Sequence, residues 1–465
     1  VDTVFETLLR YQPSSSSGPA GYRAGLAQTW SVSPGGREIR LDLNEAARFH
    51  DGKPVTALDV QFSLEAAMTK KGGAEHHRLA LSDVSSVEIA GRQQVRIRLE
   101  RPNSYVLREL AAVPILPEHI YRKRLTQSDG EWVGSGPYQV SRGPAGTMEL
   151  HRVATYWGRA PSIARIDFVR HQDSALALRE AKEGRMDIVP ELIAEHYPEQ
   201  VSAPGLAENF SEVEFHPAQF SYIVLDTKDA PFDDANLRRA IAHLIDSEGI
   251  ASTGKGLSRR VGGPVWKQGP ANGTETAPLP RDLAEAARLL EVAGWRDDDG
   301  DGVRSRDGQR LMITVLATEG RHLLRDSVLK ALRKAGFVLD LRVGNAAVLR
   351  NRLRDGEFDL AFATWSGATD SDMSTLIGSG GKQNFGAFRD LRVDAQLALL
   401  RAAWEPGKRI ALATRLGQLL RESMPIVGLS APHPRGLVHK RVQGLVVWNG
   451  WFSLRDLKIA VEDEE

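Results

Sequence analysis

The 465-residue chain contains no cysteine. This absence excludes disulfides, thiol nucleophiles, cysteine-ligated zinc and iron–sulfur clusters. The sequence also has no apolar run approaching the roughly 18 to 20 residues that a membrane helix needs, and it does not open with the basic and apolar regions of an export signal. We therefore expect a chain that does not span a membrane, taken from a precursor whose signal segment ended before Val1.

Neither sign of charge is in excess, because 60 Lys and Arg balance 60 Asp and Glu. A nucleic-acid partner is not expected, since neutralising phosphates requires a basic face. With 42% apolar and 26% charged residues, 43 glycines and 23 prolines, the composition is that of an ordinary globular protein. At roughly 100 to 200 residues per domain, the length indicates two or three domains.

The first third of the chain is patterned mainly for strands. Polar and apolar residues alternate in Arg37–Leu43 and Val95–Leu99, and residues 138–153 have the pattern of a hairpin. One helix is predicted over Ala57–Met68, with Thr56 as its N-cap. This part of the chain is therefore predicted to be rich in β-structure.

From about Asp233 onward, the patterns of helices and strands alternate. A helix is predicted over residues 237–245, with a stop signal at Gly249. A second is predicted over residues 283–290, with Asp282 as its N-cap and a stop signal at Gly294, and a third over residues 327–334. Apolar runs at 311–317, 338–343 and 358–364 predict buried strands. This alternation predicts an α/β domain with helices on both faces of its sheet.

Three short motifs suggest chemistry, but each is incomplete. Gly249–Lys255 resembles a phosphate loop without the final Ser or Thr, Asp297–Gly302 copies half of a calcium loop, and Ser327 and Lys330 stand alone without the other motifs of penicillin-binding enzymes. No GxSxG is present, and no histidines have helical ligand spacing. We assign no catalytic residue, no metal ligands and no cofactor, and we expect that the protein is not an enzyme.

Trp365 stands out because it follows the apolar run 358–364 and opens the polar segment Ser366–Asp372. Ligands of α/β domains bind beyond the carboxyl ends of parallel strands. An indole at such a position is placed either to stack on a ligand or to pack in the core.

Several motifs in a fixed order resemble the solute-binding proteins of ABC importers, in the dipeptide, oligopeptide and nickel-binding class. The matching segments are Leu26–Trp30, Arg48–Pro54 (RFHDGKP), Ile115–His119 (ILPEH), Gly134–Tyr138 (GSGPY), Tyr156–Trp157, Pro231–Asp233, Ala287–Trp295, Asp299–Val303, Phe358–Leu360 with Trp365, and Asn384 with Asp394. Each motif alone is weak, but their ordered occurrence from about residue 5 to 450 is specific.

The resemblance implies a two-lobed periplasmic-binding-protein-like α/β fold, of type II and in the large cluster with an extra β-rich subdomain. We place lobe I at 1–225 plus 430–465, its extra subdomain at 31–130, and lobe II at 226–429. The chain is expected to cross between the lobes twice. Such lobes close over a ligand, and contacts from both favour the closed state.

The function implied is that of a monomeric receptor, periplasmic or extracellular and lipid-anchored in some precursors of this kind. It would capture a small solute and present it to the transmembrane permease subunits of the importer. A peptide is the leading cargo, with nickel, heme or a sugar as alternatives. A sensor or scaffold without transport cargo and a hydrolase-type α/β enzyme are the rival interpretations.

The candidate ligand contacts that follow from the resemblance and from the position of Trp365 are Trp365, Ser366, Gly367, Ala368, Asp370, Arg321, Asn384 and Tyr222. Peptide-binding relatives commonly carry an acid three residues after this tryptophan, where this chain has Ala368. Asp370 or Asp372 is therefore a candidate to bind the peptide's amino terminus in place of the missing acid, and Arg321 a candidate partner for the peptide's carboxylate.

Overall fold

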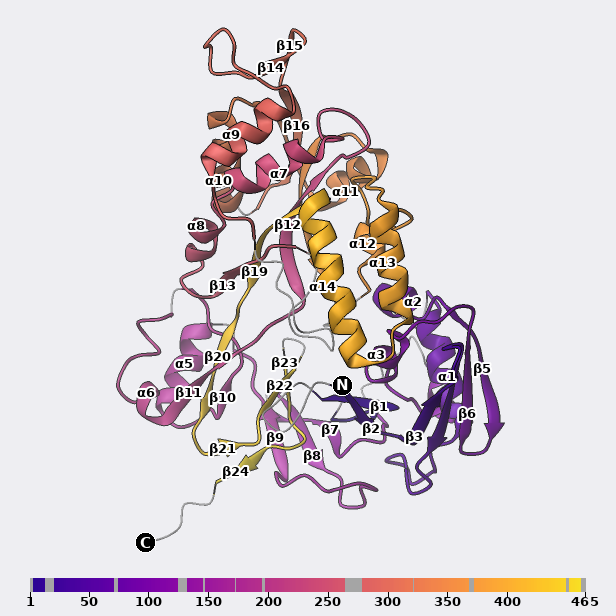
Figure 1. Ribbon diagram of the computed structural model, residues 1–465. Coiled ribbons are helices and arrows are strands. Elements are labelled where there is room, and N and C mark those ends of the chain that lie inside the picture. Colours follow the sequence, from indigo (N-terminus) through magenta and orange to yellow (C-terminus); the bar gives the residue numbers. More distant parts are fainter. Residues whose placement is uncertain are drawn as a thin grey trace. The chain divides into compact units, whose positions relative to one another are not determined.

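The computed structural model describes residues 3–12, 21–70, 74–123, 132–144, 147–171, 173–194, 197–263, 278–320, 322–367, 372–448 and 451–460 (Figure 1). Contacts divide the chain into two units. The first comprises Val1–Phe215, Arg401–Pro406 and Arg435–Glu465, and the second His216–Leu400 and Gly407–Pro434. The chain thus passes between the units four times, whereas the resemblance implies two crossings. The lobe boundaries at 225 and 430 stay a prediction beside this division.

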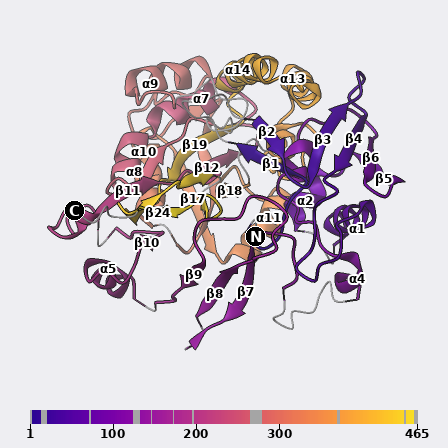
Figure 2. The same cartoon turned by 90° about the horizontal axis from the view of Figure 1, so that it is seen from below.

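The first unit is built mainly from antiparallel strands. Its four-stranded sheet has the order β3 (Ala27–Val32), β4 (Glu38–Leu43), β6 (Gln94–Leu99) and β5 (Val84–Gly91). Helix α1 (Ala57–Met68) lies beside this sheet (Figure 2). The apolar positions of the alternating strands, such as Ile39, Leu41 and Ile97, are almost fully buried in a common core. The strands predicted from this alternation are confirmed, and their apolar positions form the buried face of the sheet.

The other elements of the first unit are smaller. Its strands are β1 (Leu9–Gln12), β2 (Gly21–Ala24), β7 (Tyr138–Arg142), β8 (Met148–Arg152), β9 (Arg165–Phe168), β10 (Ile188–Val189), β11 (Phe210–Glu214), β20 (Arg435–His439), β21 (Val442–Gln443), β22 (Val446–Trp448), β23 (Trp451–Ser453) and β24 (Lys458–Ile459). Its helices are α2 (Glu75–Ala80), α3 (Val106–Leu110), α4 (Glu118–Tyr121), α5 (Ser174–Lys182) and α6 (Leu206–Asn209). The predicted hairpin at 138–153 is formed by β7 and β8.

The short segment 401–406 belongs to the first unit because of specific contacts. The backbone N–H of Ser104 donates to the carbonyl oxygen of Arg401 at 2.8 Å. The Arg401 side chain donates to Asp83 at 2.7 Å, and this carboxylate is 1% exposed. Trp404 packs against the core of the four-stranded sheet. A buried charge pair and an aromatic contact thus hold this segment in place.

The second unit has one six-stranded mixed sheet. The order is β13 (Ser258–Arg260), β19 (Ile426–Pro432), β12 (Gln219–Leu225), β18 (Leu360–Ser366), β16 (Met312–Thr318) and β17 (Val338–Gly344). Strand β16 runs parallel to both β17 and β18, and the other pairs are antiparallel. The remaining elements are α7 (Ala235–Leu244), α8 (Ser247–Ser252), α9 (Leu283–Val292), β14 (Ser305–Arg306), β15 (Gln309–Arg310), α10 (His322–Lys334), α11 (Ala346–Asp355), α12 (Ser374–Ile377), α13 (Leu391–Ala402) and α14 (Pro406–Ser423). The α/β character predicted for this region is confirmed.

Two predicted helix boundaries were wrong. The helix expected to continue to Gly249 ends at Leu244, and α8 begins two residues before Gly249, because the Asp246 side chain accepts the Gly249 N–H at 2.9 Å and caps a new helix. Helix α10 begins at His322, five residues before the predicted start. Among the described residues, no helix is long and apolar enough to cross a membrane.

Candidate ligand-binding site

Trp365 lies inside a strand of the second unit. The prediction that it follows the end of its strand was wrong, because β18 continues to Ser366 and Trp365 pairs with Phe220 of β12. Its side chain is 7% exposed, and its ring centroid lies 5.5 Å from that of Phe220. The indole is therefore held against a second aromatic ring.

Tyr222 belongs to the same aromatic cluster. Its ring centroid is 5.3 Å from that of Phe220, two residues earlier on β12. Side chains alternate along a strand, and Ile223 and Leu225 lie in the main core of the unit. Phe220, Tyr222 and Trp365 therefore share the opposite face of the sheet. Phe220 was missed in the sequence because the pairing of β12 with β18 joins segments far apart in the chain.

Burial raises the pKa of the Tyr222 phenol above its usual range. The side chain is 3% exposed. Removing a phenolate from water is costly, so the neutral form is favoured. Tyr222 can therefore offer a hydroxyl donor but no negative charge to a neighbouring group.

The residues that follow Trp365 lie at the surface. Ser366 and Gly367 are exposed, and the Gly367 N–H donates to the Ala218 carbonyl at 2.9 Å, which extends the pairing of the two strands. The predicted contacts Ala368, Asp370 and Arg321 lie outside the described residues. Backbone pairing thus fixes the position of Ser366 and Gly367.

Asn384 is separated from the aromatic cluster. Its amide donates to the carbonyls of Gly378 at 3.0 Å and Phe388 at 2.8 Å, and it accepts the Phe388 N–H at 3.0 Å. The same loop accepts the Thr227 N–H at the Gly386 carbonyl, 2.8 Å away, just beyond the end of β12. Trp365 pairs near the start of β12, whereas the Asn384 loop contacts the chain just beyond its end. The length of this seven-residue strand therefore places Trp365 and that loop about 20 Å apart. A contact of both with one small ligand is therefore not favoured.

In the first unit, three motifs of the family resemblance meet at the GSGPY loop, which His50 and Trp157 both contact. The Gly134 N–H donates to His50 Nδ1 at 3.2 Å, and His50 Nε2 lies 2.9 Å from the Gly136 carbonyl oxygen. Nδ1 is thus the acceptor, and Nε2 carries the proton. The indole of Trp157 donates to the Ser135 carbonyl at 2.9 Å. These contacts therefore join three motifs of the resemblance, RFHDGKP, GSGPY and Tyr156–Trp157.

The two glycines of this GSGPY loop are required by close packing. A β-carbon on Gly134 would lie 1.9 Å from the carbonyl oxygen of Val4, and one on Gly136 would lie 2.4 Å from that of Thr3. No side chain fits at such distances. The loop borders a cavity of about 90 Å³ lined by Arg48, Phe49, His50, Gly52, Gly136, Val153, Thr155 and Tyr156.

Burial also lowers the pKa of His50 below its usual range, although its hydrogen bond to Gly136 acts in the opposite direction. Desolvation disfavours the charged imidazolium. A neutral His50 also satisfies both glycine hydrogen bonds, whereas a protonated ring would lose its acceptor. The geometry and the electrostatics thus agree on the neutral ring.

The incomplete motifs have structural roles. Residues 249–252 are helical, so they form no phosphate loop. The carboxylates of Asp297, Asp299 and Asp301 lie together but are exposed, and each accepts a backbone N–H of the turn, those of Gly302, Asp301 and Val303 respectively. The interpretation of this segment as an Asp/Gly turn fits these hydrogen bonds.

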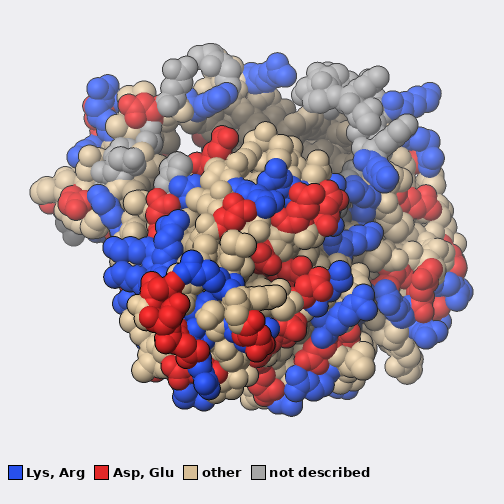
Figure 3. Space-filling model, turned by 90° about the horizontal axis from the view of Figure 1, so that it is seen from above, with Lys and Arg blue, Asp and Glu red and all other residues tan. Residues whose placement is uncertain are grey.

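The charged side chains drawn in Figure 3 are of both signs and intermingled. Basic and acidic residues alternate over this face, in keeping with the formal net charge of zero. A face of this kind offers no extended basic surface for a polyanion.

A β-rich first unit and an α/β second unit, with the chain passing repeatedly between them, define the class of two-lobed binding proteins. The family model of the bacterial extracellular solute-binding proteins, family 5, matches residues 21–387. The chain therefore belongs to this family, which confirms the resemblance and the fold class predicted from it.

Individual relatives are distant. Protein XP55 of Streptomyces lividans is 26% identical over 402 residues, which cover 82% of this chain and 70% of that protein. The probable D,D-dipeptide-binding periplasmic protein DdpA of Escherichia coli strain K12 is 25% identical over 377 residues, 78% of this chain and 69% of its own length. The structure of HbpA2 from Haemophilus parasuis superimposes with a TM-score of 0.85 at 18% identity, covering 99% of this chain and 94% of the other. This last likeness shows the fold alone.

Proposed function

We propose that this protein is the receptor of an ABC importer and that its cargo is a short peptide. The observation that supports the receptor role most directly is the match to family 5 over residues 21–387. The peptide assignment is supported by the dipeptide named for the relative DdpA. The protein would act outside the cytoplasmic membrane. It would bind its cargo without breaking a bond and deliver it to the permease subunits.

Cargo binding in this proposal shifts an equilibrium between open and closed arrangements of the chain. We assign the exposed edge of Trp365 to cargo contact, with Phe220 and Tyr222 packed beside it in the same aromatic cluster. An aromatic face contributes apolar contact area with a defined geometry and little loss of side-chain freedom. Ser366 and Gly367, held by the pairing of their strand, supply polar groups beside it.

The first test is native mass spectrometry of the purified protein, followed by identification of any mass released on denaturation. A retained or added short peptide supports the proposal. A bound heme or sugar without any peptide contradicts the peptide assignment while keeping the receptor role. A protein that binds no member of peptide, heme and sugar libraries in a thermal-shift screen contradicts the receptor role and favours a sensor or scaffold.

Substitution of Trp365 tests the assigned surface. Trp365→Ala should weaken peptide binding by more than tenfold, about 1.4 kcal/mol, if the ring contacts cargo, whereas Trp365→Phe should retain part of the affinity. Trp295→Phe is the matched control, because Trp295 is 5% exposed in the core on the other face of the sheet. Isothermal titration calorimetry gives the affinities. Unchanged binding by a folded Trp365→Ala protein would remove this surface from the site.

A further inference from the structure

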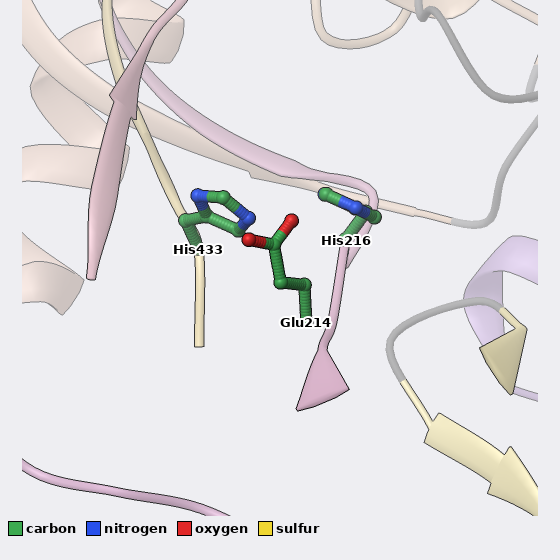
Figure 4. Close-up of side chains that lie close together, drawn as sticks. All are labelled: Glu214, His216 and His433. Carbon is green, nitrogen blue, oxygen red and sulfur yellow. The ribbon is translucent and has the colours of Figure 1, made fainter. Parts of the chain in front are cut away.

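Two histidines far apart in sequence lie together at one end of the six-stranded sheet. His216 is three residues before β12, and His433 directly follows β19. Strands β12 and β19 are antiparallel neighbours, which brings these two positions to the same end. Figure 4 shows the two imidazoles, whose ring centroids are 4.9 Å apart with an angle of 25° between the planes.

We propose that His216 and His433 form a binding site for a divalent first-row transition-metal ion. One ring nitrogen of each residue lies within 4.8 Å of the other. Two imidazole nitrogens bound to one ion at about 2.0–2.1 Å are separated by at most about 4.2 Å. Because the two rings are stacked and nearly parallel, both side chains must rotate before their nitrogen lone pairs converge on one ion, with water completing its coordination.

The backbone around both histidines is fixed by hydrogen bonds within the second unit. The His433 N–H donates to the Leu257 carbonyl at 2.8 Å, and the Ala218 carbonyl, two residues after His216, accepts the Gly367 N–H at 2.9 Å. Residues that flank two paired strands need little backbone ordering when the ion binds. This preorganisation favours a chelate over two independent single contacts.

The third side chain in Figure 4, Glu214, is not counted as a ligand. It belongs to the first unit, where its carboxylate lies 2.9 Å from Arg435 Nη2. The site consists of the two imidazoles alone. Imidazole nitrogen suits Zn²⁺, Ni²⁺ and Cu²⁺, and affinity among such ions rises toward Cu²⁺. The ions Mg²⁺ and Ca²⁺, which prefer oxygen, should not bind here.

The test is a Cu²⁺ titration of the full chain, followed by pulsed electron paramagnetic resonance, which counts the imidazoles coordinated to the ion. We expect one tightly bound Cu²⁺ with two imidazole nitrogens. His216→Asn and His433→Asn should each weaken binding at least tenfold and leave one imidazole. The double variant should lose the tight site. His151→Asn is the control, because His151 is a partly exposed histidine that contacts Glu149 in the first unit.

Each remaining outcome contradicts the proposal. A double variant that keeps the tight Cu²⁺, a wild-type signal with a single imidazole, or loss of the site in His151→Asn would place the ion elsewhere. Circular dichroism verifies the fold of each variant. If His216→Asn does not fold, His433→Gln is the deciding variant. The proposal then requires that this variant loses the tight two-imidazole Cu²⁺ signal. Zn²⁺ should raise the unfolding temperature of the wild type but not that of the folded variants, which provides a readout independent of copper chemistry.

Discussion

His50 shows how one side chain can connect segments that are distant in the sequence. Both of its ring nitrogens are used, one by the Gly134 N–H and the other by the Gly136 carbonyl. The sequence contains the motifs of both segments but does not show that they meet. Their contact depends on Gly134 and Gly136 fitting against the backbone of residues 3 and 4, which no local pattern encodes.

The stability of the first unit should fall in acid because of His50. Burial lowers the pKa of this group in the folded protein, whereas in the unfolded chain it is about 6.5. Between these two values the unfolded chain binds more protons, so the free energy of unfolding rises with pH and its contribution is complete above about pH 6.5. Urea unfolding at a series of pH values should show that the advantage of wild type over His50→Asn shrinks as the pH falls below that value.

The control for this measurement is His151→Asn, which removes a more exposed histidine from the same unit. It separates the loss of the buried His50 ring from the loss of any histidine in this unit. A difference between wild type and His50→Asn that is constant from pH 5 to 8 would show that His50 does not titrate differently in the folded and unfolded chains.

Trp365 marks the limit of residue-level prediction from sequence. Its apolar run was correctly assigned to a strand, but the end of that strand was wrong by two residues. Its partner Phe220 lies on a strand more than 140 positions earlier, and only the register of β12 with β18 brings the two rings together. His216 and His433 meet for the same kind of reason. Periodicity predicts local structure, whereas long-range pairing decides which side chains form a site.

At the scale of elements, helix α1 was predicted in full because its signals are local. The Asp59 carboxylate accepts hydrogen bonds from the Thr56 N–H at 2.9 Å and the Thr56 hydroxyl at 2.7 Å. The start of α1 is thus set by residues three positions apart. The break between α7 and α8 was missed because Ile245 continues the apolar period, while the capping Asp246 begins a new helix within it.

Asp59 also joins α1 to α4, since it accepts the Glu118 N–H at 2.8 Å while being only 5% exposed. Asp59→Ala would leave the N–H groups of Thr56 and Glu118 without this acceptor. A buried donor left unsatisfied costs about 1–3 kcal/mol. We therefore expect a loss of at least this size in the free energy of unfolding, measured by urea denaturation. Glu65→Ala, an exposed position of the same helix, should change it little. An equal effect of both substitutions would contradict the assigned role of Asp59.

At the scale of the whole molecule, chain length indicated two or three domains, and the family resemblance implied two lobes. The short segment 401–406 could not be foreseen, because its membership of the first unit depends on Asp83 and on the packing of Trp404. Each unit has a core of its own, and each contains a largely buried cation with specific partners. In the first unit, Glu6 accepts from Arg455 at 2.5 Å and from Tyr156 at 2.5 Å, and is 1% exposed.

In the second unit, Arg238 is 5% exposed and donates to four backbone carbonyls, those of Phe232, Asp233, Ser423 and Met424. Separate cores predict that heat unfolds the chain in more than one transition, so that the calorimetric enthalpy exceeds the van't Hoff enthalpy. Glu6→Gln leaves a buried arginine without its counter-charge, at about 3–5 kcal/mol, and should lower one transition only.

Arg238→Met leaves buried carbonyls unsatisfied at about 1–3 kcal/mol and should lower the other transition only. Differential scanning calorimetry of the two single variants and of the double variant is the measurement. The shifts in the double variant should equal those of the singles, because residues without shared partners act independently. A single two-state transition in the wild type, or two variants that both lower the same transition, would mean that the units unfold as one cooperative structure.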